Sequence, residues 1–313
     1  MNVLITYNTT QYSIELLEQN GFTVNTTTVA DNQLVNYINT NNISVLLVKT
    51  TRINKAFIDA CPTLKLIGYA GNQNIDTSYA KEKNIHVITA EEATRNAIAE
   101  LVFAHVFGMV RFLHQANREM PLEGDSRFNE LKKQFANGSE LQGKTIGIIG
   151  LKNAAEDIAR IAFGVGMNVI GTCNTTKSIT STLRFFNKQS VSFVIKAQPV
   201  HEVLTQSDII VVNLPKQEKY CITEKELGMM KKGIGIVNVA HGSIIDEVAL
   251  VNAIEAKHVK YAALDVFENQ PNPEVQLLMN PEISLSPNIA TTTIEATEKI
   301  GMTLAKQIIG LLK

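Results

Sequence analysis

The sequence predicts an α/β protein with two domains, each built on a parallel sheet covered by helices. Short apolar runs alternate with longer segments of helical periodicity along the whole chain, which is typical of parallel sheets with crossover helices. This alternation starts afresh at Lys144, after a polar stretch. The length of 313 residues is also sufficient for two domains.

The first domain is expected to begin with a strand at Val3–Tyr7. A helix should follow over Tyr12–Gln19, because its apolar residues recur at helical spacing. Two further strands are expected at Val45–Val48 and Leu64–Ile67. The last helix, Ile294–Leu312, is amphipathic and needs a surface to cover. We expect it to return to this domain, which then comprises residues 1–95 and 289–313.

A single long helix is expected over about Glu91–Glu119, followed by an irregular polar stretch over Pro121–Gly143. Beside its main apolar stripe, this helix carries Phe103, Phe107 and Val110 at i, i+4 and i+7. A helix that faces one core buries one stripe, so a second stripe predicts a homodimer contact. The alternative is a helix buried on most sides within its own domain.

The second domain, residues 96–288, contains the renewed alternation of strands and helices. Its expected strands are Lys144–Gly150, Asn168–Thr172, Ile209–Leu214, Ile234–Val239 and Tyr261–Leu264. The segments between them are expected to be helical, for example Asp246–Ala256.

Composition and charge exclude several classes of function. The chain has 29 basic and 30 acidic residues, so we expect no partner among nucleic acids and no attraction to a membrane. The most apolar stretch, Ala97–Leu113, is interrupted by charged side chains and does not predict a spanning helix. Three separated cysteines without a CxxC pair predict no metal site and favour a reducing, cytoplasmic location.

A strand that runs into a helix through glycines is the dinucleotide-binding arrangement, with the pattern G-x-G-x-x-G or G-x-G-x-x-A. The string here is Gly150, Leu151, Lys152, Asn153, Ala154 and Ala155. Gly150 suits the tight turn and Ala155 suits helix packing. Lys152, however, replaces the glycine that lets the backbone approach a pyrophosphate. Its ammonium group could pair with phosphate instead, but a charge does not remove the steric obstruction.

The dinucleotide pattern also requires an acidic residue about 20 residues further on, which accepts hydrogen bonds from the ribose. The strand Asn168–Thr172 leads instead to Cys173 and Asn174, and no carboxylate stands there. A neutral site with Lys177 nearby would suit the 2′-phosphate of NADP. We favour a loop that no longer binds a nucleotide, because two independent requirements fail together.

Several further stretches occur in an order and spacing that chance seldom produces. They are Ala99–Val102, Leu141–Gly150, Gly164–Met167, Asn238–Gly242, Leu264–Glu268 and Ser286–Ala290. Over essentially its whole length the chain resembles the D-2-hydroxyacid dehydrogenase family, and in particular its short phosphoglycerate dehydrogenases. The resemblance implies a Rossmann-like doubly wound domain, a flavodoxin-like substrate domain, and NAD or NADP as cofactor.

In this family an Arg holds the substrate carboxylate, a Glu orients a His, and that His transfers a proton. The resemblance places His241, Gln270 and Asn288 at these three positions. An amide cannot exchange a proton at neutral pH, so Asn288 removes the general acid/base. His241 lacks the two-pronged grip of a guanidinium, and as a relocated base it would need another substrate pose.

The resemblance also implies residues for substrate and cofactor. Substrate contacts would fall at Lys49, Tyr69 and Gly71, with Tyr69 where an Arg is usual. Asp265 is retained and lies beside the nicotinamide in relatives.

Three functions therefore remain open, and whether the chain is an enzyme is undecided. The damaged motifs favour a pseudoenzyme with weak or absent NAD or NADP binding and a role in binding or assembly. The first alternative is an active NAD(P)-dependent oxidoreductase acting on a 2-hydroxy acid such as 3-phosphoglycerate. The second is a sensor whose domains close on a ligand. The expected partner is a second copy, with an active paralogue as a further possibility.

Overall fold

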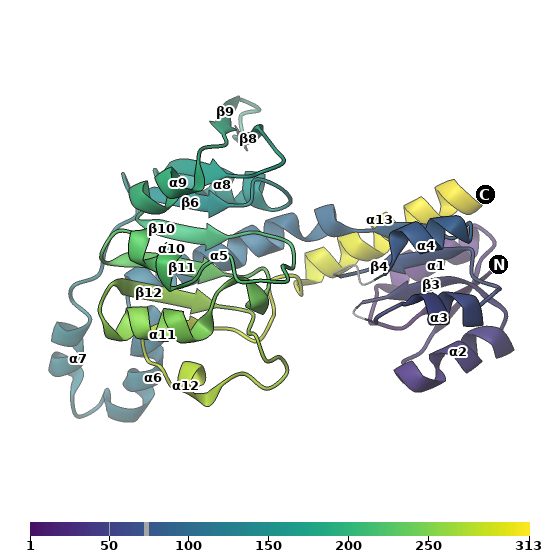
Figure 1. Ribbon diagram of the computed structural model, residues 1–313, viewed down its shortest axis with the longest axis horizontal. Helices are drawn as coiled ribbons and strands as arrows, with labels where there is room; N and C mark the ends of the chain where they lie inside the picture. The colour runs from purple at the N-terminus through teal and green to yellow at the C-terminus, as the bar shows by residue number, and fades with distance from the viewer. Residues whose placement is uncertain (50, 72–74) are drawn as a thin grey trace. The chain divides into compact units, whose positions relative to one another are not determined.

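The computed structural model describes residues 1–313 apart from 50 and 72–74. The chain divides into two compact units, residues 1–94 with 291–313 and residues 95–290. Each unit has its own parallel sheet with helices on both faces (Figure 1). The α/β fold class is thereby confirmed.

The first unit has the flavodoxin strand order. Its strands lie in the order β2-β1-β3-β4-β5 and are all parallel. They are β1 (Asn2–Ile5), β2 (Thr23–Thr26), β3 (Ile43–Val48), β4 (Leu66–Tyr69) and β5 (His86–Thr89). One face packs on α1 (Gln11–Gln19) and α13 (Ile294–Leu312). The other packs on α2 (Asp31–Thr40), α3 (Lys55–Ala60) and α4 (Thr77–Glu82).

The second unit has a six-stranded parallel sheet in the order β13-β12-β11-β10-β6-β7. Its strands are β6 (Thr145–Ile149), β7 (Asn168–Thr172), β10 (Ile209–Val212), β11 (Ile234–Asn238), β12 (Val259–Leu264) and β13 (Ile283–Leu285). One face packs on α5 (Arg95–Val110) and α8 (Ala155–Gly164). The other packs on α9 (Val200–Gln206), α10 (Glu224–Met229) and α11 (Glu247–Glu255). The short elements of this unit are η2 (Gly242–Ile244) and α12 (Val275–Leu278), whereas η1 (Glu91–Thr94) belongs to the first unit.

The prediction of a single long helix over Glu91–Glu119 is wrong. The α-helix α5 ends at Val110, and α6 (Leu113–Glu123) follows at an angle of 61°. Phe112, between them, has a left-handed backbone with φ of 55°. Its ring packs beside Tyr261, with centroids 6.0 Å apart, so a tertiary contact stabilises the break. Part of the stretch expected to be irregular is also helical, as α7 (Phe128–Gln134).

The second apolar stripe of this helix is only partly exposed. Phe103 and Val110 are buried in the core of the second unit, whereas Phe107 is 45% exposed. The stripe therefore mostly serves the unit's own core. Exposed apolar side chains near Phe107 in the chain include Leu113, Met120 and Leu122 of α6.

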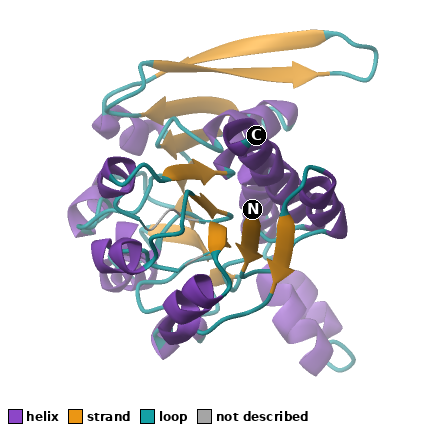
Figure 2. Ribbon diagram, turned by 90° about the vertical axis from the view of Figure 1, so that its right-hand side faces the viewer, coloured by secondary structure: helices purple, strands orange, loops and turns teal. Residues whose placement is uncertain are grey.

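The sequence predicts a helical segment between β7 and β10, but only part of this segment is helical. It forms an antiparallel hairpin of β8 (Ser178–Arg184) and β9 (Ser190–Lys196), which precedes α9. Figure 2 shows the hairpin as the long two-stranded ribbon at the top. In the first half of β8, Ile179 and Ser181 are buried while Ser178 and Thr180 are exposed, which is the period of a strand.

Within the described part of the chain, no single helix has the length and apolar character needed to cross a membrane. The segment Glu91–Val110 and helix α6 meet that requirement only when taken together, across their bend.

The carboxyl ends of β11 and β12 are held together by backbone packing. A Cβ atom on Gly242 would overlap the carbonyl group of Phe267, so only glycine fits this close approach. The contact places the loop that starts at His241 against the turn that leads to Gln270.

Two glutamates reinforce the same junction. The backbone N–H of Glu268 donates to the Glu247 carboxyl over 2.9 Å, and that of Glu247 donates to the Glu268 carboxylate over 3.0 Å. The hydroxyl of Tyr220 also donates to Glu268, over 2.8 Å. Burial raises the pKa of Glu247 to about 7, and repulsion from Glu268 adds to this.

We predict that Gly242→Ala destabilises the protein by about 2–4 kcal/mol, because the added Cβ forces two backbone segments apart. Urea unfolding measures the effect. Gly228→Ala is the matched control, since a Cβ there meets no atom within 4 Å and lies in helix α10. A Gly242→Ala variant as stable as the control would contradict the close approach.

We also predict that Glu247→Gln changes the pH dependence of stability. Because folding raises the pKa of Glu247 from 4.5 to about 7, the protonated form favours the folded state. That contribution is complete below the unfolded pKa and is lost as the pH rises through 7. The variant, which has no such loss, should gain stability relative to the parent between about pH 5 and about pH 8. Urea midpoints that shift equally in both proteins would refute this.

Candidate functional site

The glycine turn after β6 has the geometry of a phosphate-binding turn. Gly150 has a φ of 109°, and a Cβ atom there would overlap the carbonyl oxygen of Asn213. The Asn213 carboxamide donates to the carbonyls of Gly150 and Lys152, over 2.8 and 2.7 Å. The turn then enters α8 at Ala155. The main chain thus has the strand, tight turn and helix of a phosphate-binding site, irrespective of whether its side chains permit a phosphate to bind.

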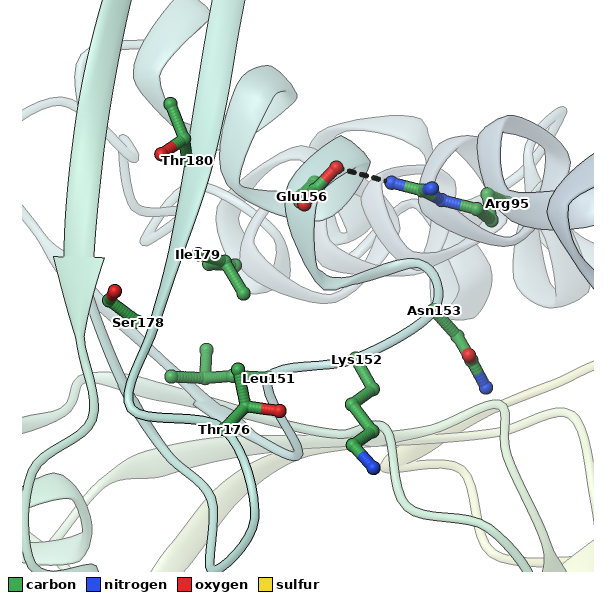
Figure 3. Close-up of a pocket in the computed structure, with 9 residues that line it drawn as sticks. All are labelled: Arg95, Leu151, Lys152, Asn153, Glu156, Thr176, Ser178, Ile179 and Thr180. Atoms are coloured by element: carbon green, nitrogen blue, oxygen red, sulfur yellow. Dashed lines mark hydrogen bonds and ion pairs between the residues drawn. The ribbon is translucent and has the colours of Figure 1, made fainter.

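A cavity of about 480 Å³ lies beside this turn (Figure 3). It is lined by the turn, the first turn of α8, the start of β8 and Arg95 of α5. In Figure 3, Lys152 and Asn153 extend from the turn on the side opposite Glu156. The exposed Lys152 side chain thus stands at the rim of the cavity.

The helix end in this cavity already holds negative charge. Glu156 and Asp157 occupy the first turn of α8, and Arg95 pairs with them over 2.6 and 3.2 Å. Carboxylates at a helix amino terminus are favourable for the helix, but they occupy the place where an anionic ligand would gain from it. A diphosphate here would have Glu156 as a close like-charged neighbour.

Cys173 follows β7 at the position expected for a ribose-binding acid. Burial alone would raise the pKa of its thiol, but hydrogen bonds from Thr175 and Thr176 outweigh it and lower the pKa to about 6. One of these partners, the Thr175 hydroxyl, lies 3.4 Å from the sulfur. At neutral pH the group is therefore mainly thiolate, an acceptor that the sequence did not indicate.

Asp265 is fully buried and accepts hydrogen bonds from the loop that carries Asn288. Its carboxylate accepts hydrogen bonds from Ser286, Ile289 and Ala290, over 2.5, 2.9 and 2.9 Å. Its carbonyl accepts from the N–H of Asn288 over 2.8 Å. Asn288 is exposed and has a left-handed φ of 56°, which asparagine tolerates well. Asp265 thus fixes the loop in which Asn288 stands.

His105 supports this loop from α5, a role that the sequence did not reveal. Its Nδ1 lies 2.8 Å from the Ser284 hydroxyl and its Nε2 lies 2.9 Å from that of Ser286. Burial lowers the pKa of His105, while the Asp265 charge opposes the shift. In the sequence, His105 belongs to the mainly apolar stripe of the expected long helix. No local pattern distinguishes it from a packing residue.

His241 and Gln270 lie on the adjacent loops described above. His241 is half-buried, and burial together with the Lys216 charge lowers the pKa of its imidazole. The ring is therefore neutral at physiological pH and cannot supply the charge of the Arg it replaces. Gln270 is exposed.

The expected substrate residues lie in the first unit. Lys49 is exposed after β3, and a Cβ on Gly71 would meet its carbonyl oxygen at 2.8 Å. Tyr69 is fully buried, and its hydroxyl donates to the Thr51 carbonyl over 3.3 Å. A tyrosine in the core cannot offer its ring to a substrate from this position. The rest of the glycine-rich loop, 72–74, lies outside the described residues.

Comparison with known proteins agrees with the motifs. Residues 103–290 match the family described as "D-isomer specific 2-hydroxyacid dehydrogenase, NAD binding domain". The chain is 30% identical over 276 residues to D-3-phosphoglycerate dehydrogenase of Bacillus subtilis, covering 86% of this chain and 49% of that protein. It therefore spans about half the length of this relative. Hydroxypyruvate reductase of Thermotoga maritima is 30% identical, with 85% of this chain and 84% of the relative covered.

Solved structures agree with the fold. A glyoxylate reductase from Paecilomyes thermophila superimposes with a TM-score of 0.82 at 26% identity, over 100% of this chain and 96% of that one. An acyclic imino acid reductase solved with NADPH and D-Arg has a TM-score of 0.81 at 24% identity, over 100% and 97% of the two chains, and supports the fold alone. On the family match, the chain belongs to the D-isomer specific 2-hydroxyacid dehydrogenases.

Proposed function

We propose that this protein is a member of the family without dehydrogenase turnover, which acts by binding or assembly. The observation that carries the proposal is Asn288. The resemblance assigns residue 288 to the family's proton-transfer position, and hydrogen bonds to the buried Asp265 hold the loop that carries it. Its carboxamide neither takes up nor releases a proton at neutral pH.

The two neighbouring substitutions support the same proposal. Gln270 retains a hydrogen-bonding group, but there is no imidazole at 288 for it to orient. His241 is neutral and short, so it offers a substrate carboxylate one contact in place of the charged, bidentate grip of an Arg. Loss of general acid/base catalysis alone costs roughly 10²–10⁴-fold in rate.

The residues around the glycine turn fit a dinucleotide poorly. The backbone turn suits a phosphate, but Lys152 at the rim replaces the glycine of the dinucleotide pattern, and Glu156 lines the cavity. NAD or NADP is the cofactor class of the family, and we expect weak or absent binding here. The Cys173 thiolate is a partial substitute for the missing ribose-binding carboxylate.

The proposed assembly is a homodimer, with pairing to an active paralogue as a further candidate. The side chains offered are Phe107 on α5 and Leu113 and Met120 on α6, which are all more than 40% exposed. This surface replaces the stripe that the sequence indicated, since Phe103 and Val110 are in the core.

An active NAD(P)-dependent oxidoreductase is the second candidate. The intact turn at Gly150 and the anionic Cys173 favour it. Relatives named D-3-phosphoglycerate dehydrogenase and hydroxypyruvate reductase make a 2-hydroxy acid the substrate class to test.

We predict that titration calorimetry with NADH and NADPH detects weak binding or none. The double variant Lys152→Gly with Cys173→Asp should bind NADH at least ten-fold more tightly, because it restores backbone approach and a ribose acceptor. Lys152→Ala with Cys173→Asp is the matched control, since it removes the charge but keeps a Cβ. Micromolar binding by the unmodified protein would show that Lys152 does not obstruct the site.

We further predict that neither the parent nor the Lys152→Gly, Cys173→Asp variant oxidises D-3-phosphoglycerate or other D-2-hydroxy acids. Adding His241→Arg, Gln270→Glu and Asn288→His should give NADH formation that is about 10²-fold or more above that background. Absorbance of NADH at saturating substrate is the measurement. Turnover by a protein that retains Asn288 would instead show that another residue transfers the proton, and would favour the active oxidoreductase.

A further inference from the structure

The β8–β9 hairpin is anchored to the second unit at its base. Ile179 and Ile195 are buried in the core cluster that includes α8. The ring of Phe193 stacks on Phe163 of α8, with centroids 4.2 Å apart and planes inclined by 22°. In Figure 1 the hairpin rises above α8 and α9. The loop at its end is therefore carried on a supported ribbon.

That loop exposes two aromatic side chains. Phe186 is fully exposed and Phe185 is 49% exposed. Part of the polar main chain of the loop is paired internally: the N–H of Phe185 donates to the Gln189 carbonyl over 2.9 Å, and that of Lys188 donates to the Phe185 carbonyl over 3.0 Å. The Asn187 side chain accepts from the Gln189 N–H over 3.1 Å. Such a loop can leave water without abandoning these hydrogen bonds.

The hairpin also carries charge of one sign. No carboxylate occurs anywhere in 174–201, where the cations are Lys177, Arg184, Lys188 and Lys196. Outside this segment the chain has all 30 of its acidic residues and 25 of its 29 basic residues. The near-neutral total conceals this local excess, and for that reason the composition indicated no attraction to a membrane. Electrostatic complementarity requires an anionic partner.

The size of the hairpin favours a lipid surface over a protein partner. Each strand has seven residues, so the ribbon is about 23 Å long and about 10 Å wide. One face then offers about 230 Å², and α8 already covers part of the inner one, whereas a stable protein interface takes about 800 Å² from each side. A second copy of the hairpin would bring cations against cations. Docking on a bilayer requires only the tip of the hairpin to make contact.

We propose that the tip of this hairpin docks on an anionic phospholipid surface, with Phe185 and Phe186 entering the interfacial layer and Arg184 and Lys188 meeting the headgroups. Aromatic side chains with adjacent cations are suited to this depth of the bilayer. The contact is peripheral and reversible, because one loop supplies few inserted groups. The proposal stands independently of whether the protein is a pseudoenzyme.

The first test is sedimentation of the full chain with vesicles. We expect binding to vesicles of phosphatidylcholine mixed with phosphatidylglycerol and none to phosphatidylcholine alone, with a loss as ionic strength rises. Phe185→Ser with Phe186→Ser should weaken binding at least ten-fold. Arg184→Gln with Lys188→Gln should weaken it about 25-fold, since each cation contributes roughly a factor of five.

A matched control separates the tip from apolar exposure in general. Phe128 is 57% exposed, similar to Phe185, and begins α7, the helix that lies at the opposite end of this unit from the hairpin in Figure 1. Phe128→Ser should bind the mixed vesicles as the parent does. Thermal unfolding of all variants checks that each is folded.

The second test uses the absence of tryptophan from the chain. Phe186→Trp introduces a single reporter, whose emission should shift to shorter wavelength on addition of the mixed vesicles. Phe128→Trp should not shift. Three results would each overturn the proposal: no binding by the parent, equal binding by the double serine variant, or an unshifted tip tryptophan. Preferential retention by polyglutamate with no binding to vesicles would likewise reject lipid in favour of an acidic protein.

Discussion

The buried carboxylate of Asp265 is the interaction on which the site region depends. An ionisable group taken out of water needs hydrogen-bond partners, and the Asp265 carboxylate accepts hydrogen bonds from Ser286, Ile289 and Ala290. The loop between β13 and the end of the unit is thereby held in one conformation. Ser286 is held in turn by His105 from α5, so a helix, a strand end and a loop are tied at one point.

This arrangement explains how the scaffold can tolerate substitutions at the three family positions. The hydrogen bonds described above for this loop use the carboxylate and carbonyl of Asp265, the Ser286 hydroxyl and main-chain N–H groups, and none of them uses the side chain at 288. Likewise, Gly242 and the Glu247–Glu268 pair hold the neighbouring loops without involving the imidazole of His241 or the amide of Gln270. Substitutions at the three chemical positions therefore leave the fold intact.

The glycine turn shows the same separation between backbone and side chain. Gly150 is required by the carbonyl of Asn213, so the turn persists for packing reasons alone. The neighbouring cavity is then free to change, and it now contains the Arg95–Glu156 ion pair and hydroxyl groups from β8. The side chains around the turn can therefore differ while its geometry remains.

The sequence by itself determined the parallel α/β fold, most strand positions and the family. These follow from local patterns: Asn168–Thr172 and Ile294–Leu312 have the bounds expected from their apolar periodicity. Motifs with fixed spacing also predict, by resemblance, that His241, Gln270 and Asn288 occupy the family's chemical positions. Contacts between distant residues decided the rest. Phe112 ends α5 because its ring meets Tyr261, and His105 becomes part of the site because Ser284 and Ser286 reach it across the sheet. Cys173 becomes acidic through hydrogen bonds that depend on how the loop folds, and the hairpin's aromatic tip is exposed because its base packs on α8. A linear pattern records spacing along the chain, whereas burial, charge and pKa depend on neighbours that only folding brings together.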